Sequence, residues 1–184
     1  MTTRDPKRRE KLLSLADGLW LSRGYAGFSF GDLSTGSGLK KPSVYHHFPS
    51  KEALLLALIA HHAKRSADFY AAMDSCPAPQ ALGAFFKVYE GLLEHPGRLC
   101  PAGAICADLE VLPRPAAELG RRYLQGQEAW LSATLARGPW SLSAPDHATM
   151  ILGALQGSLQ RARAEGSPEP LRGTLRVLQG QLGI

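Results

Sequence analysis

Cationic and hydrogen-bonding side chains gather in one short stretch of the sequence, GLKKPSVYHHFPSKEALLLALIA, which spans residues 38–60. Two adjacent lysines, a tyrosine and two histidines stand there, and a third lysine follows at the start of a long apolar run. Side chains of these types either transfer protons in catalysis or bind an anionic partner. The residues around them decide between the two.

Signatures of catalysis and of metal binding are missing from the sequence. The chain has no glycine-rich phosphate loop and no Gly-x-Ser-x-Gly nucleophile elbow. The pairs His46–His47 and His61–His62 would point about 100° apart on a helix. Neither pair has a histidine or carboxylate four residues away. We therefore expect a protein that is not an enzyme and that uses no cofactor and no metal.

The excess positive charge of the chain lies in its first third. Up to residue 65 there are 11 Lys and Arg residues against 5 Asp and Glu, and from residue 66 onward there are 10 against 11. These differences, +6 and −1, account for the net charge of +5. Such an asymmetry fits either a solvated basic surface or the electrostatic footprint of phosphate binding.

Composition excludes several other classes of protein. Hydrophobic residues make up 45% and charged residues 20% of the chain, which is typical of a globular protein. The charged N-terminus has no apolar run of a signal peptide behind it, and the run at 53–60 is far shorter than the roughly 20 residues of a membrane span. Three cysteines at unrelated spacings favour neither a disulfide framework nor a zinc site. We expect a cytoplasmic protein without membrane contact.

Helices must position the cationic stretch, because no alternating pattern of useful length indicates a strand. Capping signals predict where three helices start: Asp5 before a proline, Ser29 in a capping box with Asp32, and Ser50 before the long apolar run. Gly24 is predicted to end the first helix. Helices are predicted over 5–23, from 29 to a turn at 36–38, over 40–47, from 50 onward, and over about 79–94, 101–110, 114–136, 144–164 and 168–182. Their inward faces in the first part are predicted to include Leu12, Leu15 or Ala16, Leu19, Leu33, Leu54, Leu55, Leu58 and Ile59.

Three short helices followed by a long one, with a glycine-bearing turn between the second and third, indicate helix-turn-helix geometry. In that arrangement the third helix enters the major groove of DNA. A helix of this length is unstable alone, so we expect Val44 and Phe48, four residues apart, to anchor it inward. The cationic stretch would then face a duplex.

The run RGYAGFSFGDLSTGSGLKKPSVYHHFPSKEALLLAL resembles the DNA-binding domain of the TetR family of bacterial transcriptional regulators. The most specific part is Gly38-Leu39, then SVYHHF at 43–48, then SKEAL at 50–54, and the resemblance covers about residues 8–60. It implies an all-α fold with a helix-turn-helix domain at 1–50, and a ligand-binding and dimerisation domain at 51–184 that starts with the linking helix. It also implies DNA contacts by Ser29, Lys40, Lys41, Pro42, Ser43, Tyr45, His46 and Lys51, with Lys40, Lys41 and Pro42 at base-contacting positions.

The second helix departs from the family pattern. Ser34 and Ser37 stand where the family commonly has alanines, and Gly31 and Gly36 lie close by. Glycine in a helix costs roughly 1 kcal/mol relative to alanine. The sequence therefore predicts a second helix of reduced stability, or one that orders fully on DNA.

The resemblance implies that the second domain binds a small-molecule effector and dimerises through its last two long helices. The residues are compatible with a dimer seam formed by Leu152, Leu155, Leu159, Leu175 and Leu178, although the same leucine rows would also suit the chain's own core. Gly153 and Gly157, four apart, would let a partner helix approach closely. The pocket candidates, each of which could equally be a core or surface residue, are Phe86, Tyr89, Cys100, Glu110, Tyr123, Trp130 and Met150.

Cys100 has two interpretations. It precedes Pro101 at a predicted helix start, two residues from Arg98, and both features would lower the pKa of its thiol, as in an electrophile or redox sensor. The alternative is a small buried hydrophobic residue. Cys106 should lie on nearly the opposite face of the helix, so the two cannot easily pair.

The family resemblance implies a homodimeric repressor that sits on a palindromic operator in double-stranded DNA and leaves it when the effector binds. Nothing in the residues excludes activation in place of repression. The alternatives are a cysteine-based sensing regulator, a helical enzyme, and a helical interaction module that uses its basic end on acidic protein or RNA.

Overall fold

A computed structural model describes residues 5–141 and 143–184, and these residues form helices without strands, as predicted. No helix within the described part of the chain combines the length and apolar character needed to cross a membrane. The helices are α1 (Pro6–Arg23), α2 (Phe30–Ser37), α3 (Lys41–His47), α4 (Lys51–Met73), α5 (Ala78–Gly91), the 3-10 helix η1 (Leu92–Glu94), α6 (Pro101–Asp108), α7 (Arg114–Ala136), α8 (Ala144–Glu165) and α9 (Glu169–Leu182).

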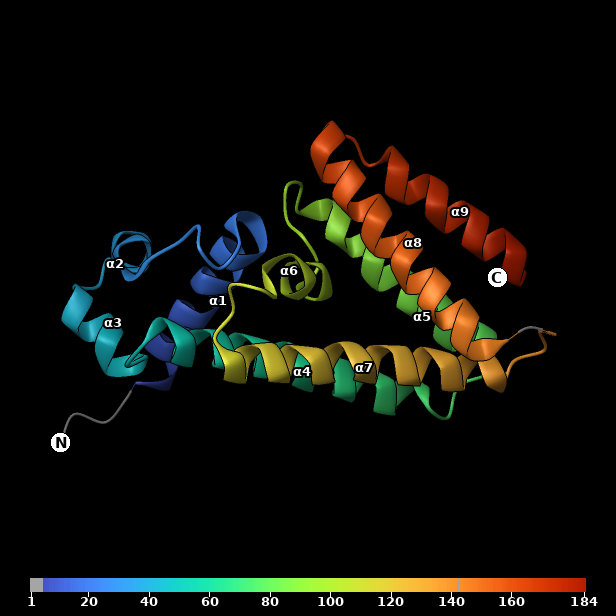
Figure 1. Cartoon of the computed structure of the whole chain (residues 1–184), viewed down its shortest axis with the longest axis horizontal. Coiled ribbons are helices and arrows are strands. Elements are labelled where there is room, and N and C mark those ends of the chain that lie inside the picture. Colours follow the sequence, from blue (N-terminus) through green and yellow to red (C-terminus); the bar gives the residue numbers. More distant parts are fainter. Residues whose placement is uncertain (1–4, 142) are drawn as a thin grey trace.

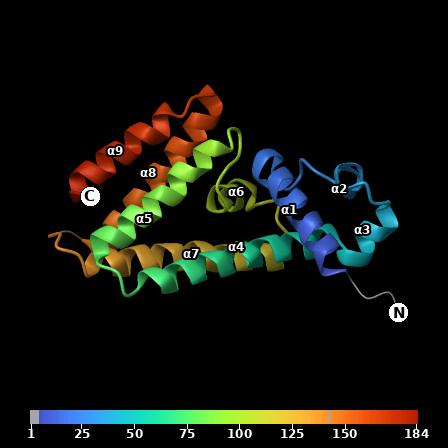
Figure 2. The ribbon, with the colours of Figure 1, turned by 180° about the vertical axis from the view of Figure 1, so that it is seen from behind.

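Two long helices form the spine of the molecule. Figure 1 shows α4 and α7 running side by side, with α1, α2 and α3 gathered at one end of the pair and α5, α8 and α9 crossing its other end. The reverse view in Figure 2 shows α6 between α1 and the α5–α8–α9 group. We call α1–α3 the head and the remaining helices the body.

The predicted caps at the head are present. The Asp5 carboxylate accepts a hydrogen bond from the Lys7 N–H at 3.0 Å, and the chain leaves α1 at Gly24 with a φ of 75°. Ser29 and Asp32 form the complete capping box at the start of α2, and the Ser50 hydroxyl accepts from a backbone N–H at the start of α4. Each cap satisfies N–H groups that the first helical turn leaves without an intrahelical partner.

The hydrophobic core beneath the head extends beyond it. Leu12, Ala16 and Trp20 from α1 are fully buried, so Ala16 takes the inward position and Leu15 and Leu19 are only half-buried. The other inward-facing residues predicted for α2 and α4, and the anchors in and after α3, are buried as well, namely Leu33, Val44, Phe48, Leu54, Leu55, Leu58 and Ile59. Residues of α6 and of the first turns of α7 complete this core, which therefore draws on both sides of the domain boundary expected at residue 50.

The second core lies among α5, α7, α8 and α9. Leu152, Leu155, Leu159, Leu175 and Leu178, predicted to form a dimer seam, are between 0 and 9% exposed in it. These leucines join α8 to α9 and to the rest of the body within one chain. Their assignment to a seam is therefore corrected, because a leucine row at helical spacing packs equally well against helices of its own chain.

Direct hydrogen bonds tie the end of α1 to the body. The Leu99 N–H donates to the Leu21 carbonyl at 2.8 Å, and the Arg163 guanidinium donates to the Ser22 carbonyl at 2.7 Å. The Asp108 carboxylate accepts from the Trp20 indole N–H at 3.1 Å and from the backbone N–H of residue 25 at 2.7 Å. The last carbonyls of α1 are thus satisfied by groups from the body.

Candidate nucleic-acid interface and body cavity

The α3 helix presents a polar, cationic surface to solvent. Lys40 at its N-cap and Lys41, Pro42, Ser43 and His46 on the helix are all exposed. Val44, His47 and Phe48 form the opposite, buried side. The structure thus brings together the predicted contact residues of this helix on one face, and their contact with DNA stays a prediction.

Tyr45 is held in place although it is 52% exposed. Its ring lies against the Phe30 ring at the start of α2, with 4.7 Å between the ring centres. The phenol hydroxyl is thereby carried on a side chain of restricted freedom at the edge of α3. A hydrogen-bond donor fixed in this way loses little entropy when it meets a phosphate oxygen.

The residues that depart from the family pattern on α2 support the turn. The Ser34 hydroxyl donates to the Leu39 carbonyl at 2.6 Å, and the Ser37 hydroxyl donates to the Leu33 carbonyl at 2.5 Å while accepting from the Leu39 N–H. A Cβ on Gly36 would stand 2.8 Å from a methyl carbon of Leu15, so the glycine allows α1 and α2 to approach closely. These contacts hold α2 against its neighbours, and the reduced stability predicted for α2 stays a prediction.

Two of the predicted contact residues carry structural tasks. Ser29 is exposed, but its hydroxyl is engaged with Asp32 and with the N–H groups of α2. The Lys51 ammonium donates to the Phe28 carbonyl and lies 4.6 Å from the Tyr25 ring centre and 4.5 Å from that of Phe28. Burial lowers the pKa of Lys51 in this position. Lys51 therefore fastens the α1–α2 connection to the start of α4.

A cavity of about 540 Å³ lies in the body next to the head. Its walls come from α1, α4, α5, α6, α7 and the segment between α5 and α6. Three of the predicted pocket residues line it: Tyr89, Cys100 and Tyr123. Its volume falls within the range of roughly 300–1,000 Å³ that is typical of small-molecule sites.

The other four predicted pocket residues lie elsewhere. Phe86 is fully buried in the second core, and Trp130 is buried beside the cavity, stacked on Tyr70 at 4.6 Å. Glu110 is exposed at the end of α6, and Met150 is 47% exposed on α8. Aromatic content alone predicted these residues, and it does not reveal which face of each helix borders the cavity.

Several lining residues were not predicted. Asp17 and His62 meet at 2.6 Å between α1 and α4, and Arg65, Ser66 and Gln127 lie on the neighbouring walls. Their polar side chains occur at ordinary helical positions, so no local sequence signal distinguishes them from surface residues. Only the arrangement of helices brings them to one space.

Cys100 has the environment of a structural residue. It is 5% exposed, and its sulfur accepts the Gly103 N–H at 3.2 Å as the N-cap of α6. Burial raises the pKa of the thiol to about 11, outweighing the hydrogen bond from the helix start. This corrects the prediction of a lowered pKa, which considered the helix start and Arg98 but not desolvation. Cys106 is exposed, in agreement with its predicted opposite face.

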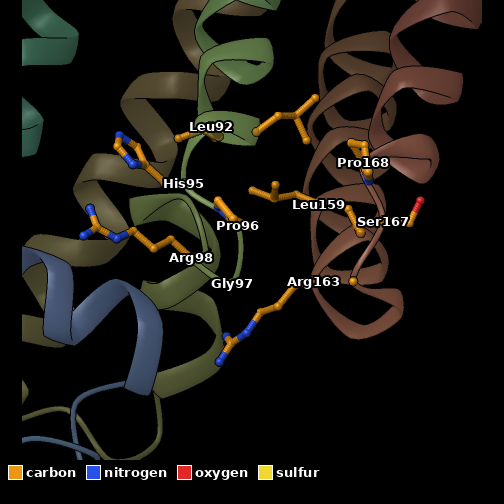
Figure 3. A pocket seen from close by; sticks show the side chains of 12 residues that line it. Leu92, His95, Pro96, Gly97, Arg98, Leu159, Arg163, Ser167 and Pro168 are labelled. Atoms are coloured by element: carbon orange, nitrogen blue, oxygen red, sulfur yellow. The ribbon is translucent and has the colours of Figure 1, made fainter.

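A second, much smaller cavity of about 80 Å³ lies between the 92–98 segment and the α8–α9 connection. Figure 3 shows Leu159 and Pro168 on one side of it and Pro96 on the other. Arg98 and His95 extend from the 95–98 segment away from this cavity, while Arg163 extends toward α1. Its volume is well below that of a small-molecule site.

A short cationic helix, braced by a glycine-bearing turn and mounted on a long helix, defines a helix-turn-helix protein of the DNA-binding regulator class. Comparison with known proteins gives the same class. Residues 12–58 match the family described as bacterial regulatory proteins, tetR family. This match and the relatives below support the TetR family of bacterial regulatory proteins, with the family match confined to the N-terminal part of the chain.

Relatives resemble different parts of the chain. The transcriptional regulator EthR of Mycolicibacterium smegmatis is 40% identical over 72 residues, which are 39% of this chain and 33% of that protein, so the chain spans about a third of that relative's length. A TetR-family regulator from Legionella pneumophila has the same fold with a TM-score of 0.87 and 26% identity, covering 99% of this chain and 100% of that one. A TetR-family regulator from Agrobacterium tumefaciens shares the fold with a TM-score of 0.88 at 23% identity, covering 96% and 97%.

Proposed function

We propose that the protein is a homodimeric transcriptional repressor that leaves a palindromic operator when a small molecule enters the 540 Å³ cavity. The observation that carries this proposal is that α1 forms part of the cavity wall. Asp17 and Leu21 of α1 line the cavity, and α1 supports both α2 and the turn that leads to α3. A ligand in the cavity therefore touches the head directly.

The proposed mechanism is a shift between two arrangements of the head. The Asp17 carboxylate, held to His62 at 2.6 Å, joins α1 to α4 at the cavity. A ligand that competes for either side chain would favour an arrangement in which the two recognition helices no longer match successive major grooves, about 34–36 Å apart. Reversing occupancy from 99:1 to 1:99 requires a preference of about 5.5 kcal/mol, which two sites in a dimer can share.

For the dimer we propose the outer face of α8 and α9. Val177 is 59% exposed and Met150 47% exposed, and both are large apolar side chains turned away from the body's core. Gly153, Gly157 and Gly180 lie on the same two helices, and a Cβ added to any of them would meet nothing within 4 Å. Glycines in the middle of a helix weaken it, and close approach of a partner helix would account for them.

The test of DNA binding is retention of genomic fragments by the purified full-length protein, followed by sequencing. We expect enrichment of a palindrome whose half-site centres lie about one helical turn apart. On that duplex, affinity should fall steeply with salt, because Lys and Arg release counterions from phosphates. Absence of any enriched sequence, or binding insensitive to salt, would contradict the proposal.

The dimer face is tested by Gly157→Leu, with Gly126→Leu on α7 as the matched control. Both glycines are exposed, helical and without neighbours within 4 Å, so neither substitution should disturb the folded chain. Sedimentation velocity should show that only Gly157→Leu shifts the protein toward monomer and weakens operator binding. Equal behaviour of the two variants would move the seam to another surface.

A further inference from the structure

The charged residues around the body cavity are unbalanced. Arg65, Lys87 and Arg98 are among its lining residues, and Asp17 is the single lining residue with a carboxylate in the described part of the chain. That carboxylate is already held by His62 at 2.6 Å. The cavity thus has a positive excess, which favours an anionic occupant.

Arg98 stands out among the three cations because it is half-buried while Arg65 and Lys87 are exposed at the rim. Its guanidinium lies against the backbone of α1, where a Cβ on Gly18 would stand 2.9 Å from a terminal nitrogen. Within the described part of the chain the guanidinium has neither an ion pair nor a hydrogen bond. In Figure 3 it extends away from Leu159 and Ser167, toward the α1 side. A half-buried guanidinium without an ion pair has unused capacity for a planar anion.

The interior of the cavity offers hydrogen bonds from neutral groups. Gln127 is 7% exposed and its side-chain oxygen has no partner, while its nitrogen lies 3.5 Å from the Tyr89 hydroxyl. Turning the amide over would exchange the two ends and still leave one of them without a partner. Burial raises the pKa of Tyr70, Tyr89 and Tyr123, so these phenols are protonated at neutral pH and can donate. An unsatisfied buried amide offers a hydrogen bond to a molecule that enters the cavity.

The apolar part of the lining is aromatic. Phe69 and Phe85 lie on the cavity walls with Tyr70, and all three rings pack against Trp130. Rings fixed by their neighbours form a rigid surface on which a flat apolar body can stack.

We propose that the effector of the cavity is an apolar, aromatic anion whose acidic group meets Arg98 and whose ring system lies among Phe69, Tyr70 and Phe85. This rests on the proposed function, because it names the chemical class of the molecule that would release the operator. A carboxylate or sulfonate would complete the charge balance at the α1 wall. A cationic ligand of the same shape would meet three like charges and no free carboxylate.

The experiment uses two fluorescent probes with the same body, 8-anilinonaphthalene-1-sulfonate and N-phenyl-1-naphthylamine, which differ by the sulfonate. We expect the full-length protein to bind one molecule of the sulfonate per chain, at least about tenfold more tightly than the neutral amine, as for a partly desolvated charge pair. Arg98→Gln should abolish this preference. The control Arg122→Gln removes the same charge from an exposed position of α7 outside the cavity and should retain it.

Three results would overturn the proposal: equal binding of the two probes, a preference that survives Arg98→Gln, or no binding of the sulfonate. Circular dichroism checks that the Arg98 variant is folded; if it is not, Arg65→Gln at the rim replaces it, with a smaller loss of preference expected. Operator binding is measured separately, without probe. If the protein binds no operator but prefers the sulfonate probe, the proposed function alone is refuted. If it binds an operator but shows no preference between the probes, the ligand class alone is refuted.

Discussion

Replacing Lys51 by Met distinguishes a packing role of this residue within the head from a contact with a DNA phosphate. Methionine keeps the apolar stem but removes the ammonium that donates to the Phe28 carbonyl and lies over the Tyr25 and Phe28 rings. A hydrogen bond from a charged donor is worth about 1.5 kcal/mol at the low end of its range, and an exposed cation–π contact about 0.5 kcal/mol. Counting one such hydrogen bond and two such contacts, we expect the free energy of unfolding to fall by about 2.5 kcal/mol.

A loss of that size in a chain of 184 residues corresponds to a melting temperature lower by about 5–10 °C. The assay is thermal unfolding followed by circular dichroism, combined with operator binding across a salt series at a temperature where the variant is folded. If the ammonium is engaged within the head, the salt slope should stay unchanged. If it neutralises a phosphate instead, the slope should flatten by about one unit per half-site, with little change in stability.

Lys40→Met is the matched control, because Lys40 is exposed at the start of α3 and its side chain makes no capping hydrogen bond. It should leave the melting temperature unchanged and flatten the salt slope by about one unit per half-site. The packing role of Lys51 would be refuted if Lys51→Met behaved like this control. It would also be refuted if neither stability nor affinity changed.

Three further outcomes are expected. Because the pKa of the Cys100 thiol is raised to about 11, only about one in 10⁴ of these side chains is a thiolate at pH 7. A timed alkylation read by mass spectrometry should therefore show exposed Cys106 labelled first. Fast labelling of Cys100 with release of DNA would restore the sensor interpretation. Val177→Glu should give a folded monomer by sedimentation, whereas Leu178→Glu should lose cooperative unfolding because it places a carboxylate in the body's core; a folded Leu178→Glu chain would contradict that core assignment. Hydrogen bonds from the side chain and N–H of the N-cap serine lower the pKa of Asp32. The capping box therefore stabilises the head at pH values above the ordinary Asp pKa, and this contribution is lost as the pH falls through the lowered value. Asp32→Asn should remove that pH dependence from an acid titration of stability.

The sequence predicted those features of the fold that depend on neighbouring residues. The capping box of Ser29 and Asp32 and the Ser50 cap are present because each involves groups within three residues of one another. The anchors Val44 and Phe48 are buried, since one-sided periodicity in a short helix leaves little choice of inward face.

The sequence could not predict features that depend on which helix faces which. On α8 the leucine row and the glycine row lie on different sides, and periodicity does not say which side meets the chain's own core. At Cys100 the helix start and the nearby arginine were visible, but the burial that controls its pKa was not. Gln127 looked like any surface residue of α7, and only the cavity gives its amide a role.

The bonds from Leu99, Asp108 and Arg163 to the end of α1 bear on the design of chimaeric regulators. A natural way to give this protein a new target would be to exchange its first 50 or so residues for those of a relative. Such an exchange would separate Trp20 from Asp108, leaving an indole N–H and a carboxylate without their partners at a largely closed junction. It would also break the core that α1 shares with α6 and α7. A working hybrid should therefore carry α6 and the first turns of α7 together with the donor's head, so the exchangeable unit is discontinuous in sequence.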